Sequence, residues 1–141
     1  MISIQLRLGT SPAKEEIQRS ANDLADTSKN AAGYFASTEE AAAAIGEAGD
    51  SSGERVWQLP LPADYRRKID SDVADMKNTG GKWGGAITAA CFLQEFVGET
   101  PWAHIDIAGP ARADKDDAYI SKGGTGFGVR LLVALAAAAA G

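Results

Sequence analysis

The run of residues 80–90 reads Gly-Gly-Lys-Trp-Gly-Gly-Ala-Ile-Thr-Ala-Ala, and its apolar character continues to residue 97. Residues 86–97 contain only three polar side chains, which belong to Thr88, Gln94 and Glu95. A helix with so little polar surface is normally buried on most of its circumference. The stretch therefore predicts a largely buried helix, preceded by a pair of glycines.

Other elements alternate along the chain on both sides of this helix. The segment of residues 103–108 is short, apolar and bounded by proline and glycine, which predicts an interior strand. Farther upstream, Ser37 and Glu40 have capping-box spacing, and they predict a helix over residues 39–48 that stops at Gly49.

Three further segments continue this alternation. They are a short strand or extended segment at residues 56–61, a short helix at residues 63–69, and a glycine-rich turn at residues 123–128 that leads into a last helix at residues 129–140. The alanine runs inside two of the predicted helices favour helix formation. Strands that alternate with helices predict a layered α/β fold.

The first 28 residues differ in kind from the rest. Isoleucine and leucine alternate with polar residues over residues 2–8, which is typical of a strand with one buried face. Ser11 as N-cap and Pro12 at the first helical position then predict a helix.

Composition limits the class of protein. A chain of 141 residues is one domain by size, and its net charge of -5 leaves no basic footprint for nucleic acid. The apolar residues 131–140 cover about half the length that spans a bilayer. No signal-peptide pattern opens the sequence, and the single cysteine, Cys91, favours a reducing compartment. We expect a soluble, cytoplasmic protein without a nucleic-acid or membrane partner.

Two residues that suggest chemistry have structural explanations. His104 is the only histidine, and with Cys91 it cannot form a zinc site unless other ligands converge. Cys91 lies inside an apolar segment, where a free cysteine behaves as a small hydrophobic residue. We interpret both side chains as structural.

Three more features favour structural interpretations as well. The glycine-rich residues 123–128 match neither the Rossmann fingerprint nor the phosphate-binding loop, so they predict a tight turn. The acidic residues at 114–117 lack the spaced ligands and the glycine of a calcium loop and predict a solvated connection. The scattered tryptophans are expected in the core or at an interface, and they are Trp57, Trp83 and Trp102.

The runs at residues 80–90 and 102–109, the second reading Trp-Ala-His-Ile-Asp-Ile-Ala-Gly, resemble the C-terminal signature of the cytosol (leucyl) aminopeptidases. These two-metal enzymes of metallopeptidase family M17 remove N-terminal residues from peptides. The similarity continues through Gly-Glu-Arg-Val-Trp-Gln-Leu-Pro-Leu-Pro at residues 53–62 and Gly-Thr-Gly at residues 124–126. It implies a partial three-layer catalytic domain, with a mixed sheet flanked by helices, for residues 29–141. Residues 1–28 are then a diverged or replaced N-terminal segment.

The resemblance also implies a substrate pocket. In the family, the end of the Asp-Ile-Ala-Gly strand and the residue two after its glycine line the pocket for the substrate's N-terminal side chain. Here these positions are Ala108 and Ala111. A third lining position, on the side of the leaving residue, falls at Thr79. Some family members have methionine near position 111, so alanine implies a roomier pocket.

The family's two divalent metal ions, manganese or zinc, are held near the run Asn-Thr-Asp-Ala-Glu-Gly-Arg, which does not occur in this sequence. We therefore assign no catalytic residue and no metal ligand to this chain and expect it to be inactive alone. The alternative is a non-catalytic remnant that acts as a structural or partner-binding subunit. The family acts on peptides and is hexameric, so the expected partners are further copies of the chain or the missing catalytic half.

Overall fold

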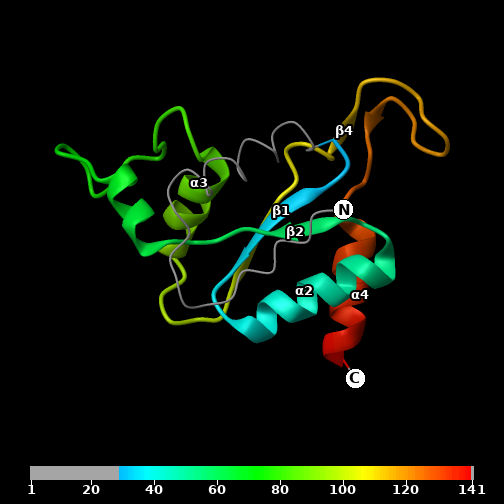
Figure 1. Cartoon of the computed structure of the whole chain (residues 1–141), viewed down its shortest axis with the longest axis horizontal. Helices are drawn as coiled ribbons and strands as arrows, with labels where there is room; N and C mark the ends of the chain where they lie inside the picture. The colour runs from blue at the N-terminus through cyan, green and yellow to red at the C-terminus, as the bar shows by residue number, and fades with distance from the viewer. Residues whose placement is uncertain (1–28, 141) are drawn as a thin grey trace.

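The computed structural model describes residues 29–140 (Figure 1). In chain order, its elements are β1 (Ala32–Ala36), α2 (Glu39–Ser52), β2 (Val56–Gln58), the 3-10 helix η1 (Ala63–Ile69), α3 (Gly85–Gln94), β3 (Ala103–Asp106), β4 (Arg112–Ala113), β5 (Gly123–Gly124) and α4 (Val129–Ala140). The strand and helix predicted before residue 29 lie outside the described residues. No helix in this part of the chain has both the length and the apolar run that a bilayer crossing requires.

The strand β1 lies at the centre of a three-stranded sheet with the order β2-β1-β3. β2 runs parallel to β1, with Gly33 opposite Trp57, and β3 runs antiparallel, with Phe35 opposite His104. This mixed sheet with flanking helices confirms the predicted α/β fold. The central strand itself escaped prediction, because residues 32–35 are all buried and its sequence therefore lacks the alternation of a half-exposed strand.

Helices cover both faces of the sheet. Tyr34 and Phe35 are adjacent on β1, so their side chains point to opposite faces. Phe35 packs in one core cluster with Tyr65 of η1 and Ile87 of α3, and Tyr34 packs in another with Ile45 of α2. Figure 1 shows α3 and the α2–α4 pair on different sides of the strands. The described residues therefore form a helix–sheet–helix arrangement with two small cores.

The N-cap of α2 differs from the predicted one. Thr38 caps the helix, and its Oγ1 accepts a hydrogen bond from the Ala41 N–H at 3.2 Å. The prediction of Ser37 as the cap is wrong because this side chain contacts another segment. Its Oγ accepts a hydrogen bond from the Trp102 N–H at 2.9 Å, which fixes the start of α2 next to the start of β3.

α2 also continues past its predicted end at Gly49. Gly49 is buried where the helix crosses Val56 of β2, and a Cβ at this position would lie 2.6 Å from Val56 Cγ2. The glycine therefore allows close packing and does not terminate the helix. The helix ends before Gly53, whose φ of 70° is the left-handed conformation typical of a helix C-terminus.

Most residues of the helix α3 are buried or half-buried, and the exposed ones are Gly85, Ala89, Leu93 and Gln94. Ile87, Ala90 and Cys91 pack in the core, whereas Leu93 is 40% exposed and Phe96, beyond the end of the helix, is 68% exposed. The predicted burial of most of the circumference is therefore confirmed, although the helix ends at Gln94 and not at residue 97.

The strand β3 ends at Asp106, and in the part of the chain that the structure describes it forms an edge of the sheet. Among the described residues β3 pairs with β1 on one side only and none of its own residues is buried, so the prediction of an interior strand is wrong for this part of the chain. Two other predictions are confirmed, since η1 and α4 have the expected bounds. β2 occupies the first half of the extended segment predicted at residues 56–61.

Three buried acids make stability depend on pH. The pKa values of the Cys91 thiol and of the Tyr34 and Tyr65 phenols are raised, mainly because these groups are buried. Each group is neutral when protonated, so the folded state holds these protons more tightly than the unfolded state. Their stabilisation is complete below the unfolded-state pKa values and is lost as the pH rises through the folded-state values.

We therefore expect the midpoint of urea unfolding to be lower at about pH 10 than at about pH 7. In parallel, a thiol reagent should label Cys91 at least about a hundredfold more slowly in native protein than in urea-unfolded protein, since the thiol is buried and protonated. Equal midpoints at the two pH values, or equal labelling rates, would contradict this account of the core.

Candidate functional site

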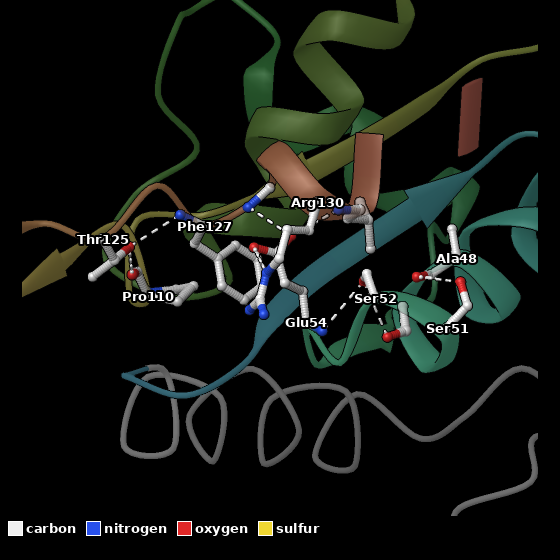
Figure 2. Close-up of polar contacts among 11 residues, drawn as sticks. Ala48, Ser51, Ser52, Glu54, Pro110, Thr125, Phe127 and Arg130 are labelled. Atoms are coloured by element: carbon white, nitrogen blue, oxygen red, sulfur yellow. Dashed lines mark hydrogen bonds and ion pairs between the residues drawn. The ribbon is translucent and has the colours of Figure 1, made fainter. Parts of the chain in front are cut away.

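A buried carboxylate connects the end of α2 to the start of α4. The Glu54 side chain is 3% exposed, and its Oε2 accepts hydrogen bonds from the Gly128 N–H at 3.0 Å and the Leu131 N–H at 2.9 Å (Figure 2). Arg130 Nε lies 3.5 Å from Oε1. The first N–H groups of a helix have no partner inside the helix and favour negative charge. The Glu54 carboxylate accepts hydrogen bonds from these N–H groups and supplies a negative charge at the start of α4. It thereby holds α4 beside α2.

A second set of hydrogen bonds fixes the turn before α4 (Figure 2). Thr125 Oγ1 donates to the Pro110 carbonyl at 2.6 Å and accepts from the Phe127 N–H at 3.1 Å. The Thr125 N–H donates to the Ala111 carbonyl at 3.0 Å. Within the same segment, Gly126 and Gly128 have positive φ values of 71° and 95°. The predicted tight turn is therefore confirmed only for residues 125–128, because Gly123 and Gly124 form the strand β5. This turn is tied to the turn that follows β3.

Two of the three predicted pocket residues lie together in that turn. The Ala108 N–H donates to Asp106 Oδ1 at 3.0 Å, and Ala108 is exposed. Ala111 is half-buried, and its N–H donates to the Ile107 carbonyl at 2.9 Å. Thr79 is exposed in the irregular segment before α3, and Figure 1 shows this segment apart from the turn after β3. Ala108 and Ala111 therefore lie in one turn of the described chain, and Thr79 lies in a different segment.

The side chains that could bind a metal are dispersed. Among residues 29–140, no group of three or more histidine, cysteine, aspartate and glutamate side chains comes together. His104 stacks on Phe35, with ring centroids 6.0 Å apart and an interplanar angle of 15°. The Glu54 carboxylate is occupied by backbone N–H groups, and Asp106 Oδ1 accepts from its own turn. These residues do not form a ligand set for the two ions that the family implies.

The acidic residues at 114–117 lie in a solvent-exposed connection, as predicted. Asp114 forms an ion pair with Lys29, and Asp116 Oδ1 accepts a hydrogen bond from the Lys122 N–H at 2.7 Å. Trp102 packs against the core, whereas Trp57 and Trp83 are about half-exposed, at 45% and 51%.

A cavity of about 950 Å³ opens between these segments. Its walls come from residues 29–30, the Gly53–Glu54–Arg55 corner and the loops between residues 110 and 130. None of the three predicted pocket residues lines it, although Pro110 and Thr125, which flank Ala111 in space, do. The sequence held no local signal for this cavity, because its basic side chains come from distant positions.

Comparisons with known proteins agree with the arrangement of these elements. Residues 23–133 match the model of the cytosol aminopeptidase family, catalytic domain. The chain belongs to the cytosol aminopeptidase family. A probable cytosol aminopeptidase of Synechococcus sp. (strain JA-3-3Ab) is 55% identical over 102 residues, which are 72% of this chain and 20% of that protein. A second, of Brucella melitensis biotype 1, is 52% identical over 101 residues, 72% of this chain and 21% of its own length.

Two solved structures agree with the fold. The bottromycin maturation enzyme BotP in complex with Mn superposes with a TM-score of 0.79 at 38% identity, over 86% of this chain and 27% of that chain. A mutant of tomato leucine aminopeptidase superposes with a TM-score of 0.72 at 39% identity, over 80% and 22% of the two chains. The chain thus spans about a fifth of the length of the curated cytosol aminopeptidases it matches.

Proposed function

We propose that this chain supplies the C-terminal, substrate-pocket part of a leucyl-aminopeptidase-type catalytic domain and does not hydrolyse peptides alone. The observation that carries the proposal is the match of residues 23–133 to that catalytic domain, in a chain that covers 20% of a curated relative's length. The complete domain would release N-terminal amino acids from peptides with two divalent ions, manganese or zinc. The curated relatives are called cytosol aminopeptidases, which supports a cytoplasmic location for this chain.

The chemistry explains why the rest of the domain is needed. A two-metal hydrolase requires ligands for both ions, a polarised water and a charge that stabilises the tetrahedral intermediate. In the described part of this chain, Glu54 is occupied by the start of α4 and Asp106 by its own turn. These residues therefore hold the pocket wall in place, and we assign no reaction step to them.

Within this proposal, Ala108 and Ala111 line the pocket for the substrate's N-terminal side chain, and Thr79 lies on the side of the leaving residue. The hydrogen bond between Ala111 and Thr125 supports a rigid wall at this position. Rigid positioning is what a specificity pocket requires.

The direct test is an assay of the purified chain with leucine amide and added manganese, zinc or cobalt. We expect background turnover from the chain alone. When it is co-purified with a family segment that carries the Asn-Thr-Asp-Ala-Glu-Gly-Arg motif, we expect metal-dependent hydrolysis. Chelator-sensitive turnover by the pure chain would overturn the proposal.

A structural or partner-binding subunit is the second candidate, and exposed apolar surface supports it. On α4, Val129, Leu132 and Val133 are 61%, 56% and 65% exposed, and their spacing places them on one side of the helix. Contiguous apolar surface of this kind marks interaction sites in soluble proteins. The partner in this proposal is a further copy of the chain or the missing catalytic half.

We expect the isolated chain to self-associate, because nothing in the described residues covers the apolar side of α4. Sedimentation velocity should show species larger than a monomer, and Leu132→Lys should shift the population toward monomer. Ala137→Lys, at the distal end of the same helix, is the control variant. It removes a smaller apolar side chain than Leu132→Lys does, so it should shift the population toward monomer less. A compact monomer that binds no hydrophobic dye would contradict this expectation.

The pocket assignment predicts a change of specificity. In the reconstituted enzyme, Ala111→Met should narrow the pocket and shift relative kcat/KM among N-terminal residues by about tenfold, since small steric changes in a pocket correspond to roughly 1–3 kcal/mol. Kinetics with leucine, alanine and methionine amides would measure the shift. Unchanged specificity together with early unfolding would show that Ala111 is a packing residue, because overpacking of a core costs about 1–3 kcal/mol.

A further inference from the structure

The charge of the 950 Å³ cavity differs in sign from that of the whole chain. The chain has a net charge of -5, yet five basic residues and three acidic ones line the cavity. The basic residues are Lys29, Arg55, Arg112, Lys115 and Arg130. They come from separate segments, so only the folded chain brings their charges together.

Two of the three acidic residues are already compensated. Glu54 accepts hydrogen bonds from the backbone at the start of α4, with Arg130 Nε beside it. Asp114 pairs with Lys29, and the hydrogen bond and charge of Lys29, followed by the charge of Arg112, lower the pKa of the Asp114 carboxyl. The third acidic residue, Asp117, is the remaining free carboxylate among the lining residues that the structure describes.

Three cationic side chains have no counter-ion among the residues that the structure describes. Within residues 29–140, Arg55, Arg112 and Lys115 form no ion pair, and all three are exposed along the cavity. An arginine guanidinium presents a planar fork of donors that matches a phosphate or carboxylate oxygen pair. Several such groups around one concave space raise the local concentration of anions.

The cavity also has room and apolar surface for more than a bare ion. Its volume lies at the upper end of the range of about 300–1,000 Å³ that holds small molecules. Phe127 and Tyr119 contribute aromatic side chains to the lining, and Phe127 is held by the Thr125 hydrogen bond to its N–H. An aromatic ring offers a surface on which a flat organic group can stack.

We propose that this cavity binds a small organic phosphate, with the phosphate group at Arg55, Arg112 and Lys115 and a flat body against Phe127 or Tyr119. The proposal does not depend on peptide hydrolysis, because binding can be measured on the chain without metal or substrate.

Phenyl phosphate and inorganic phosphate are suitable probes, titrated separately at constant ionic strength and followed by NMR chemical shifts of the full chain. We expect saturable shifts around residues 110–130, tighter binding of phenyl phosphate than of inorganic phosphate, and weaker binding of both as salt increases. Arg55→Gln and Arg112→Gln should each weaken phenyl phosphate binding by at least about fivefold. The matched control is Arg67→Gln, because Arg67 is exposed on η1 and does not line the cavity.

Equal weakening by Arg67→Gln would show non-specific attraction and overturn the proposal. Non-saturable shifts, or shifts that map to η1 or α3, would do the same. If Arg112→Gln does not fold, as judged by circular dichroism, Arg55→Gln still decides the question, because the Arg55 side chain is exposed and forms no ion pair in the described chain.

Discussion

Glu54→Ala is expected to lower the free energy of unfolding by about 3 kcal/mol, because it leaves two buried backbone N–H groups without an acceptor. These donors belong to Gly128 and Leu131, which are both buried, and the carboxylate they lose is itself 3% exposed. The substitution also removes the negative charge that favours the start of α4. Urea unfolding followed by circular dichroism would measure the loss.

Two further variants distinguish the hydrogen bonds from the charge. Glu54→Gln keeps an acceptor oxygen and should cost less than Glu54→Ala. Glu47→Gln, at an exposed position of α2, should change stability by less than about 0.5 kcal/mol. A Glu54→Ala protein as stable as the parent would show that α4 is held by apolar packing alone.

Gly49→Ala should destabilise the protein by about 1–2 kcal/mol, although alanine is the better helix former by up to about 1 kcal/mol. The added Cβ would lie 2.6 Å from Val56 Cγ2 and 3.2 Å from the Glu54 carbonyl. Valine has a stiff χ1 angle, and the carbonyl belongs to the backbone, so neither neighbour can move aside easily. The steric cost therefore exceeds the gain in helix propensity.

The same helix provides a matched control for this substitution. A Cβ at Gly46 would lie 3.7 Å from the Tyr34 hydroxyl, which is an ordinary contact. Gly46→Ala should therefore stabilise the protein by about 0.5–1 kcal/mol. Adding Val56→Ala should make Gly49→Ala less costly in a double-mutant cycle measured by urea unfolding. Equal effects of the two glycine substitutions would contradict the close packing of α2 on β2.

Sequence alone was sufficient for the elements whose signals are local. The positions of η1 and α4 were predicted because proline, glycine and alanine act on the backbone within a few residues. The glycine-rich turn followed in the same way for residues 125–128, whereas Gly123 and Gly124 pair with β4. The family was also recognisable from the sequence, since its motifs are continuous runs of residues.

Tertiary contacts decided the features that local signals could not. Ser37 and Thr38 are both residue types that favour the N-cap position. Because the Ser37 side chain hydrogen-bonds to Trp102, Thr38 caps the helix. Gly49 has the residue type of a helix end, but its contact with Val56 places it inside the helix. β1 became the central strand because helices bury both of its faces, which removed the alternation that marks a strand in sequence.

Whether a candidate site could be predicted also depended on how far apart its residues lie in the sequence. Ala108 and Ala111 are neighbours in the chain, so a single motif indicates both. The basic residues of the cavity lie as far apart as positions 29 and 130, and they meet only because Glu54 holds α4 beside α2 and Thr125 ties the last turn to Pro110. Local chemistry therefore determined η1, α4, the turn before α4 and the family, whereas hydrogen bonds between distant segments determined which charges share one cavity.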